Sequence, residues 1–183
     1  MAKFDISLFT KCVNFAAIKH KDQRRKDVEK TPYINHPIGV ASILTSEAGI
    51  EDQHVLMAAL LHDTVEDTNT TFDEIEKHFG TIVRSIVEEV TDDKKLPSKE
   101  RKQLQIVHAP NCSHSAKLVK LADKLYNLRD LDRAVPEGWS KNYYEDYYVW
   151  AEKVVRGLRG TNAPMERELD IIFKRKGLIP DCK

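Results

Sequence analysis

One imidazole and three carboxylates occur within six consecutive residues, His62-Asp63-Thr64-Val65-Glu66-Asp67. On a helix, His62 and Glu66 are about 40° apart, as are Asp63 and Asp67, so all four lie within an arc of about 140°. Carboxylates this close repel one another unless protons or a cation intervene, and burying them unpaired is costly. A divalent metal ion is the natural neutraliser, so this segment predicts metal chemistry.

Two further segments could complete such a site. His36 is expected at or near the N-cap of a helix, while Asp123 and Asn127 project together, four residues apart, from a second helix. That second helix is apolar on two sides, which is typical of a central helix whose carboxylate needs a partner. Alone, His36 is typical of a helix cap and Asp123 of a lysine salt bridge. Their combination with His62-Asp63 favours a metal site on three helices.

A basic run and an aromatic cluster are the other candidates for function. Residues 19–26 hold five Lys or Arg and one Asp, which suits a solvated helix C-terminus or a phosphate clamp. Residues 143–150 hold four tyrosines and Trp150 at helical spacing. We expect most of these rings to be core and Tyr147 to be the one that could line a substrate cleft.

Helical periodicity runs through the whole chain and predicts a single all-α domain of about eight to ten helices, without strands. The domain covers residues 1–183, with a core over about 8–176. Pro37 suits position N1 of its helix and Gly49 its stop, and Thr71 to Glu74 form a capping box. The helices are expected over 5–21, 37–48, 52–65, 72–79, 81–90, 97–107, 113–131, 140–158 and 164–176.

Composition narrows the class of protein. Lys plus Arg and Asp plus Glu each number 29, for a net charge of +0, which argues against a dedicated nucleic-acid-binding protein. No apolar stretch approaches the roughly 20 residues of a membrane span. The three cysteines, Cys12, Cys112 and Cys182, are too scattered for a disulfide framework or a structural zinc site. With no signal-peptide pattern over Met1–Asp5, we expect a reduced, cytoplasmic protein.

Taken together, the motifs resemble those of a known family. His36-Pro37, His62-Asp63-x-x-Glu66-Asp67 and the segment 121–127 resemble the H…HD…D pattern of the HD-domain metal-dependent phosphohydrolases. More narrowly, with Thr31-Pro32-Tyr33-Ile34-Asn35, they resemble the hydrolase domain of the RelA/SpoT homologues, closest to the small stand-alone metazoan members. The likeness extends over about residues 8–176 and implies an HD-domain helical bundle.

The resemblance also implies roles for individual residues. One Mn²⁺ per chain is expected on His36, His62, Asp63 and Asp123, with Fe²⁺ or Zn²⁺ possible by ligand type. Glu66 and Asp67 would orient or deprotonate the metal-activated water. The implied substrate is guanosine tetraphosphate or pentaphosphate, hydrolysed to pyrophosphate and GDP or GTP. Its expected contacts are Arg24, Arg25, Lys26, Lys124, Asn127 and Tyr147, and the loop Asp92 to Lys99 is expected near the ligand.

Other functions stay open at this point. The same site could remove the 2′-phosphate of NADPH, and sequence cannot weigh the two substrates. Another HD-type nucleotidase is disfavoured by the Tyr33-to-Pro37 stretch and by the Glu66-Asp67 pair. A catalytically inactive nucleotide-binding domain is disfavoured because every expected metal ligand and both acids are present, and a helical scaffold without a site would carry no metal. The expected partner is a small nucleotide, not a nucleic acid or a membrane, and the oligomeric state is left open.

Overall fold

The computed structural model describes residues 4–180, and within this range every regular element is helical. A lone β-bridge between Arg24 and Pro32 is the only extended pairing in that range, which confirms the predicted all-α class. Cys12 and Cys112 are free thiols, and Cys182 lies outside the described residues. The helices are α1 Ile6–Lys19, α2 Asn35–Ser46, α3 Gln53–Leu61, α4 Thr64–Asp67, α5 Phe72–Phe79, α6 Thr81–Val90, α7 Ser98–His108, the 3₁₀ turn η1 Ala109–Asn111, α8 His114–Arg133, α9 Lys141–Leu158 and α10 Ala163–Arg175.

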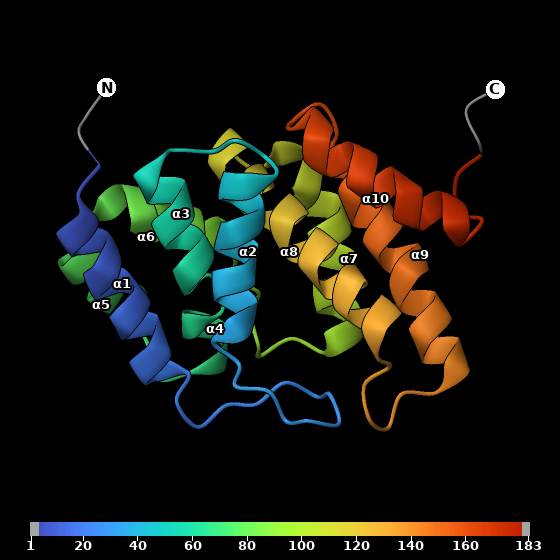
Figure 1. Cartoon of the computed structure of the whole chain (residues 1–183), viewed down its shortest axis with the longest axis horizontal. Helices are drawn as coiled ribbons and strands as arrows, with labels where there is room; N and C mark the ends of the chain where they lie inside the picture. Colours follow the sequence, from blue (N-terminus) through green and yellow to red (C-terminus); the bar gives the residue numbers. More distant parts are fainter. Residues whose placement is uncertain (1–3, 181–183) are drawn as a thin grey trace.

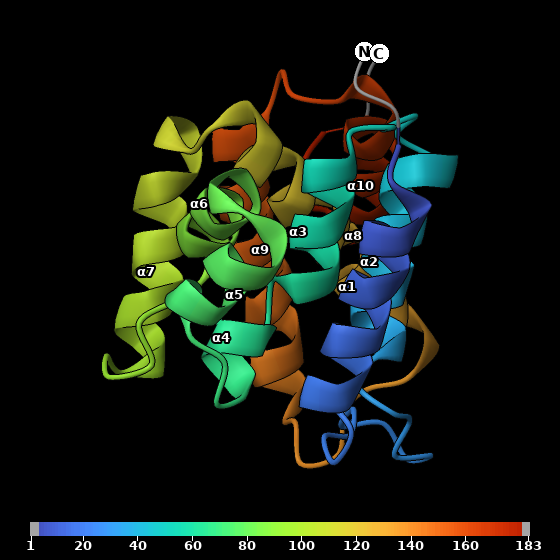
Figure 2. The same cartoon turned by 90° about the vertical axis from the view of Figure 1, so that its left-hand side faces the viewer.

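Two helices form the centre of the bundle. In α3 every residue from Val55 to Leu61 is buried, so this helix is enclosed on all sides. The 20-residue α8 packs against α2, α3, α6, α9 and α10 (Figures 1 and 2). Its predicted apolar stripe is buried as expected, namely Leu118, Leu121, Ala122, Leu125 and Leu128. Any polar side chain on α8 is therefore held by the most rigid part of the fold.

Side chains close the first turns of several helices. The carboxylate of Asp5 accepts a hydrogen bond from the Leu8 amide at 2.9 Å, and the Thr71 hydroxyl accepts one from Glu74 at 3.1 Å. The predicted limits of α2 were wrong. It begins at Asn35, so Pro37 is its third residue, and it ends at Ser46, before Gly49. The amides of Glu47 and Ala48 both return to the Ile43 carbonyl, which ends the helix early.

The helix predicted over residues 52–65 is broken. α3 ends at Leu61 and α4 begins at Thr64, with His62 and Asp63 between them. The Thr64 hydroxyl donates to the Leu61 carbonyl at 2.7 Å, in place of a helical amide bond. Consequently His62, Asp63, Glu66 and Asp67 do not share one helix face, and the break redirects Asp63.

The elements that carry chemistry lie at one end of the bundle. The irregular segment 20–34, α4 and the start of α2 lie together along the lower edge of Figure 1, whereas the first and last described residues lie in its upper half. Among residues 4–180, no helix is both long and apolar enough to cross a bilayer.

Candidate active site

Four side chains bring metal-ligating atoms to one buried point. The Nε2 atoms of His36 and His62 are 3.2 Å apart. Asp63 Oδ2 lies 3.5 Å and 3.1 Å from these two nitrogens, and Asp123 Oδ1 lies 3.2 Å and 3.7 Å from them. Neighbouring ligands of an octahedral ion, each about 2.1 Å from it, are about 3.0 Å apart. These five separations therefore match donors arranged around one ion. The ligating atoms of His36, His62 and Asp123 all lie within 4.8 Å of one another.

Hydrogen bonds outside this cluster set the direction of its donors. His62 Nδ1 faces the Ala59 carbonyl at 2.7 Å, so that nitrogen carries the proton and Nε2 keeps its lone pair. The Tyr33 hydroxyl donates to Asp63 Oδ2 at 2.6 Å, and the Asn127 amide donates to Asp123 Oδ1 at 2.7 Å. Two imidazole nitrogens facing each other at 3.2 Å need a proton or a cation between them. The residues present therefore fit a divalent metal ion.

The electrostatics of the cluster point the same way. Burial lowers the pKa of His36, whereas Asp63 and Asp123 overcome the burial of His62 and raise its pKa well above the usual value. Burial alone would raise the pKa of Asp123, but Lys124 and the two histidines hold it well below its ordinary range. The carboxylates thus stay ionised inside the protein, which is the state that a metal requires.

The Glu66 and Asp67 carboxylates extend from α4 beside the cluster. Glu66 Oε1 accepts from Arg101 at 2.9 Å, and Glu66 Oε2 accepts from the Asp92 amide at 3.4 Å. Burial, with Asp92, Asp63 and Asp67 nearby, raises the pKa of Glu66 to about 7, while the hydrogen bond from the Asp92 amide acts in the opposite direction. A carboxylate with this pKa can exchange a proton near neutral pH.

Asp67 is held from two directions. The Gln23 amide donates to Asp67 Oδ2 at 2.8 Å, and Lys94 forms an ion pair with Oδ1. The Gln23 amide is itself fixed, because His20 Nδ1 lies 2.6 Å from its Oε1. Part of the loop expected near the ligand, at Lys94, therefore covers the acid pair.

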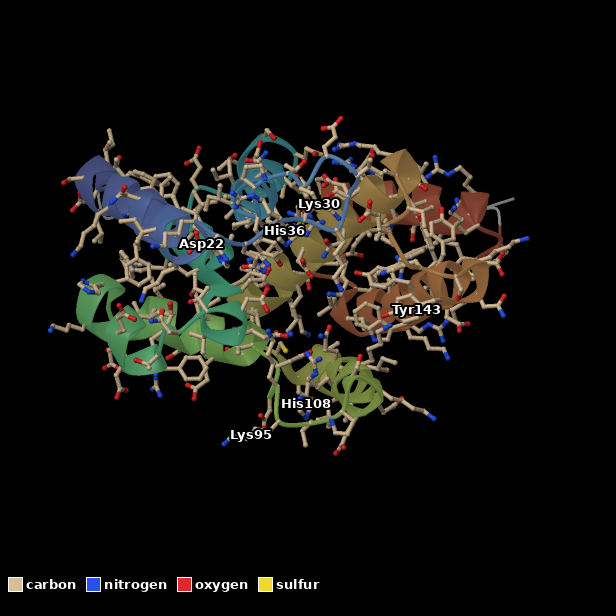
Figure 3. All side chains as sticks on the ribbon, turned by 90° about the horizontal axis from the view of Figure 1, so that it is seen from below. Asp22, Lys30, His36, Lys95, His108 and Tyr143 are labelled. Carbon is tan, nitrogen blue, oxygen red and sulfur yellow. The ribbon has the colours of Figure 1, made fainter. Side chains whose placement is uncertain are left out.

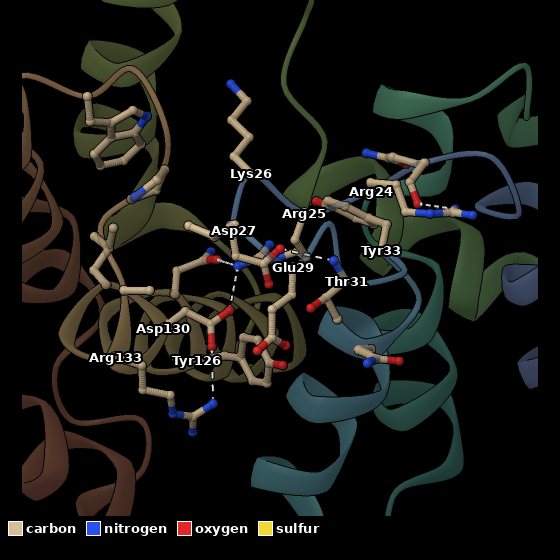
Figure 4. Close-up of a pocket in the computed structure, with 18 of the residues that line it drawn as sticks. Arg24, Arg25, Lys26, Asp27, Glu29, Thr31, Tyr33, Tyr126, Asp130 and Arg133 are labelled. Atoms are coloured by element: carbon tan, nitrogen blue, oxygen red, sulfur yellow. Dashed lines mark hydrogen bonds and ion pairs between the residues drawn. The ribbon is translucent and has the colours of Figure 1, made fainter.

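A cavity of about 940 Å³ opens next to Asp67 (Figure 4). This volume lies within the roughly 300–1,000 Å³ range of small-molecule sites. The wall includes Arg24, Arg25, Lys26, Asn127 and Tyr147, all expected to contact substrate. Lys124 does not line it: this residue is buried, with Nζ 2.7 Å from Asp123 Oδ2 and 4.9 Å from the Trp150 ring centre.

The three basic residues of the wall behave differently. Arg25 is half-buried and donates to Asn127 Oδ1 at 3.0 Å and to Asp130 Oδ2 at 2.8 Å, so it links segment 20–34 to α8 and is not part of a solvated helix end. Arg24 donates to the carbonyls of Lys21 and Gln23. The Lys26 side chain extends away from the other labelled residues in Figure 4.

Several functional positions were not found from the sequence. Tyr33 lies in a quoted motif, but nothing in the pattern indicates that its hydroxyl meets Asp63. Gln23 and Arg101 contact the acid pair across 44 and 35 residues of chain, so no local spacing links them to it. Trp139 also lines the cavity and lies in a loop without periodicity.

The site combines a largely buried N₂O₂ donor set from α2, the α3–α4 junction and α8 with an adjacent acid pair and a nucleotide-sized cavity with basic walls. This combination is typical of metal-dependent phosphohydrolases with the H…HD…D pattern. Residues 12–152 match the HD domain family. The chain is 67% identical over 174 residues to a Xenopus tropicalis protein named guanosine-3′,5′-bis(diphosphate) 3′-pyrophosphohydrolase MESH1, covering 95% of the chain and 97% of that protein. The human MESH1 protein is 66% identical, covering 90% of the chain and 92% of that protein. The chain belongs to the HD-domain family and to the group that contains these MESH1 proteins.

Solved structures agree with this placement. One, described as a metazoan orthologue of SpoT that hydrolyses ppGpp and plays a role in starvation responses, superposes with a TM-score of 0.94 at 54% identity, covering 97% of the chain and 100% of the other. A Listeria monocytogenes protein, lmo0812, gives a TM-score of 0.65 at 32% identity, over 78% of the chain and 98% of its own.

Proposed function

We propose that this protein hydrolyses the 3′-pyrophosphate of guanosine 3′,5′-bis(diphosphate), and of its 5′-triphosphate form, to pyrophosphate and GDP or GTP. The observation that carries the proposal is the convergence of the His36, His62, Asp63 and Asp123 donors at 3.1–3.7 Å, beside the acid pair. The names of the MESH1 relatives and of the SpoT orthologue support the substrate.

The proposed metal is one Mn²⁺ per chain, held by these two imidazoles and two carboxylates. A mixed nitrogen and oxygen set suits Mn²⁺, and by ligand type also Fe²⁺ or Zn²⁺. When bound, such an ion lowers the pKa of a water and polarises a phosphoryl oxygen. Asp63 and Asp123 are oriented for this by Tyr33 and Asn127.

The acid pair is proposed to accept the proton of the attacking water and to orient that water. Glu66, with its raised pKa, accepts a proton from the attacking water, and Asp67 orients that water. The water oxygen bonds to the phosphorus next to ribose O3′, the O3′–P bond breaks, and O3′ takes a proton. Pyrophosphate leaves with the water oxygen, and the nucleoside keeps its 5′-phosphates.

The cavity is proposed to hold the guanosine part of the substrate. Tyr147 and Asn127 form its wall near the donors, while Arg24 and Lys26 lie on the side of segment 20–34. Arg24 and Lys26 would contact the 5′-phosphates. Lys124, which is paired with Asp123, would contact the substrate at the donor cluster. We propose that residues 1–183 form one domain, because the central α8 packs against α2, α3, α6, α9 and α10. We also propose that the protein works in the cytoplasm on a small nucleotide and binds no nucleic acid.

A substrate panel tests this function. Purified protein with Mn²⁺ should release pyrophosphate from guanosine 3′,5′-bis(diphosphate), and a chelator should abolish the release. Replacing both acids, Glu66→Ala with Asp67→Ala, should abolish turnover while metal binding persists. Phosphate release from NADPH without pyrophosphate release from the guanosine substrate would overturn the proposal in favour of a 2′-phosphatase.

A further inference from the structure

A second group of charged residues lies beside the acid pair and outside the cavity. Arg101 on α7 pairs with Glu66, and Gln105 on the same helix donates to Asp92 Oδ2 at 2.6 Å. Lys120 lies on α8 one helical turn before Lys124, and the charges of Asp92 and Asp123 are close enough to act on it. Neither Arg101 nor Lys120 lines the 940 Å³ cavity. In Figure 3, Lys30 of segment 20–34 and Lys95 of the loop before α7 lie on opposite sides of His36.

Arg101 and Lys120 both have unused binding capacity. Arg101 donates a hydrogen bond from Nη1 to Glu66 Oε1. The Nε atom of Arg101 is buried and has no partner among residues 4–180. Lys120 is only 8% exposed, and no hydrogen bond or ion pair to it occurs within the described range. Burial and the neighbouring Lys124 lower its pKa. Since an unpaired buried cation is costly, these two groups form a place prepared for an anion.

The direction of the substrate decides which anion this is. If the nucleoside occupies the cavity and the phosphorus next to O3′ lies at the His and Asp donors, the next phosphate extends past the donors. Segment 20–34, which walls the cavity, carries Lys30 on one side of His36, and the loop that leads into α7 carries Lys95 on the other side. A 3′-pyrophosphate has such a distal phosphate, whereas a ribose monophosphate has none.

We propose that Arg101 and Lys120 bind the distal phosphate of the 3′-pyrophosphate and thereby select pyrophosphate over monophosphate substrates. This inference rests on the proposed function and adds its specificity. Arg101 leaves Glu66 for the phosphate, which frees the Glu66 carboxylate to accept the proton of the attacking water. The bonds made and broken are those given above, so the two cations bind without entering the covalent step.

The structure allows Arg101 to make this exchange. No residue of α7 is buried, and the helix is attached to α9 by Lys102, whose Nζ lies 4.6–5.4 Å from the ring centres of Tyr143, Tyr147 and Trp150. Lys120, in contrast, is fixed on α8. The subsite therefore combines one cation on a helix without buried residues with one on the central helix α8.

The test compares two substrates that differ by one phosphate, guanosine 3′,5′-bis(diphosphate) and guanosine 5′-diphosphate 3′-monophosphate. In Arg101→Gln and in Lys120→Met, kcat/KM for the pyrophosphate should fall about tenfold to a hundredfold, the range for a lost hydrogen bond to a charged group. For the monophosphate, kcat/KM should not fall in Lys120→Met, and it should rise in Arg101→Gln, because Glu66 is then no longer paired with Arg101. Lys99→Gln, at an exposed position of the same helix, is the matched control and should behave as wild type.

Binding of inorganic anions gives a readout independent of turnover. By calorimetry on the Mn²⁺-loaded protein, both variants should lose affinity for inorganic pyrophosphate by a similar factor while keeping that for orthophosphate. Equal losses for both substrates would mean that Arg101 acts only through Glu66, and unchanged kcat/KM would mean no contact; either overturns the inference. If Lys120→Met does not fold, Arg101→Gln decides alone. Absence of pyrophosphate release by the wild-type protein would instead refute the proposed function.

Discussion

Replacing Tyr33 by phenylalanine removes one oxygen atom from the surroundings of the proposed metal site. The Tyr33 hydroxyl donates to Asp63 Oδ2 at 2.6 Å. Burial and the Asp63 charge raise the pKa of Tyr33, so the phenol stays protonated and remains a donor. Its ring lies against His20 and His36, with centroids 5.0 Å and 5.7 Å away. Phenylalanine keeps these ring contacts, and Asp63 alone loses a partner.

The size of the effect follows from the type of bond. A hydroxyl-to-carboxylate bond of this length is charge-assisted, and hydrogen bonds to charged groups contribute about 1.5–3 kcal/mol. That range corresponds to about 10-fold to 100-fold in a dissociation constant, which is also the usual loss when an outer partner of a metal ligand is removed. We therefore expect Tyr33→Phe to weaken Mn²⁺ binding by this factor.

Free Mn²⁺ measured by electron paramagnetic resonance during a titration gives the affinity without any substrate. Tyr126→Phe is the matched control, because its ring also lies on His36, at 5.0 Å, while its hydroxyl forms no hydrogen bond with the described residues. The control should bind Mn²⁺ as the wild type does. Wild-type affinity in Tyr33→Phe would refute the idea that this hydroxyl orients a metal ligand.

Two other changes test the packing and the charge of the site. In Gly39→Ala the new Cβ would lie 1.9 Å from Tyr126 Cε2; the overpacking should cost about 1–3 kcal/mol, offset by the roughly 1 kcal/mol that alanine gains in a helix. The Tyr126 ring must then move into the cavity. Expressed as a free energy, the rise in KM should therefore exceed the loss in the free energy of unfolding, and an unchanged KM would contradict this. Burial and nearby carboxylates raise the folded pKa of Glu66 from 4.5 to about 7, so its stabilising contribution is complete below about pH 4.5 and is lost as the pH rises through 7. In urea unfolding of metal-free protein, Glu66→Gln should therefore gain up to about 3 kcal/mol on the wild type between pH 4.5 and pH 8, and a pH-independent difference would rule this out.

The parts of the fold that could be predicted are those in which local pattern and tertiary packing agree. The apolar stripe of α8 is long and regular, so it identified a central helix correctly, and Asn127 does meet Asp123 as the four-residue spacing predicted. The break between α3 and α4 was missed for a physical reason. The Thr64 hydroxyl takes the place of a backbone hydrogen bond. Tyr33, 30 residues away, donates to the Asp63 carboxylate that the break redirects toward the two histidines.

The support of the site was hidden because it depends on contacts between distant segments. The four proposed metal ligands, two histidines and two aspartates, were recognisable by their residue type and spacing. Gln23, Arg101 and Tyr33 are ordinary residues in the sequence, and only the folded chain shows that each holds one of the site's carboxylates. Arg25 was expected either at a solvated helix end or on a ligand, and the structure shows a third outcome, a link from segment 20–34 to α8.

Segment 20–34 has a consequence for the order of events during synthesis. One of its links to the site depends on a partner made much later, since the Arg25 bond to Asn127 spans 102 positions of the chain. A ribosome will have exposed His36, His62 and Asp63 long before Asp123 emerges. Because metal binding and folding are coupled in such sites, the nascent chain cannot complete its metal centre until α8 is made. Metal loading, and with it activity, therefore begins only after translation has passed α8.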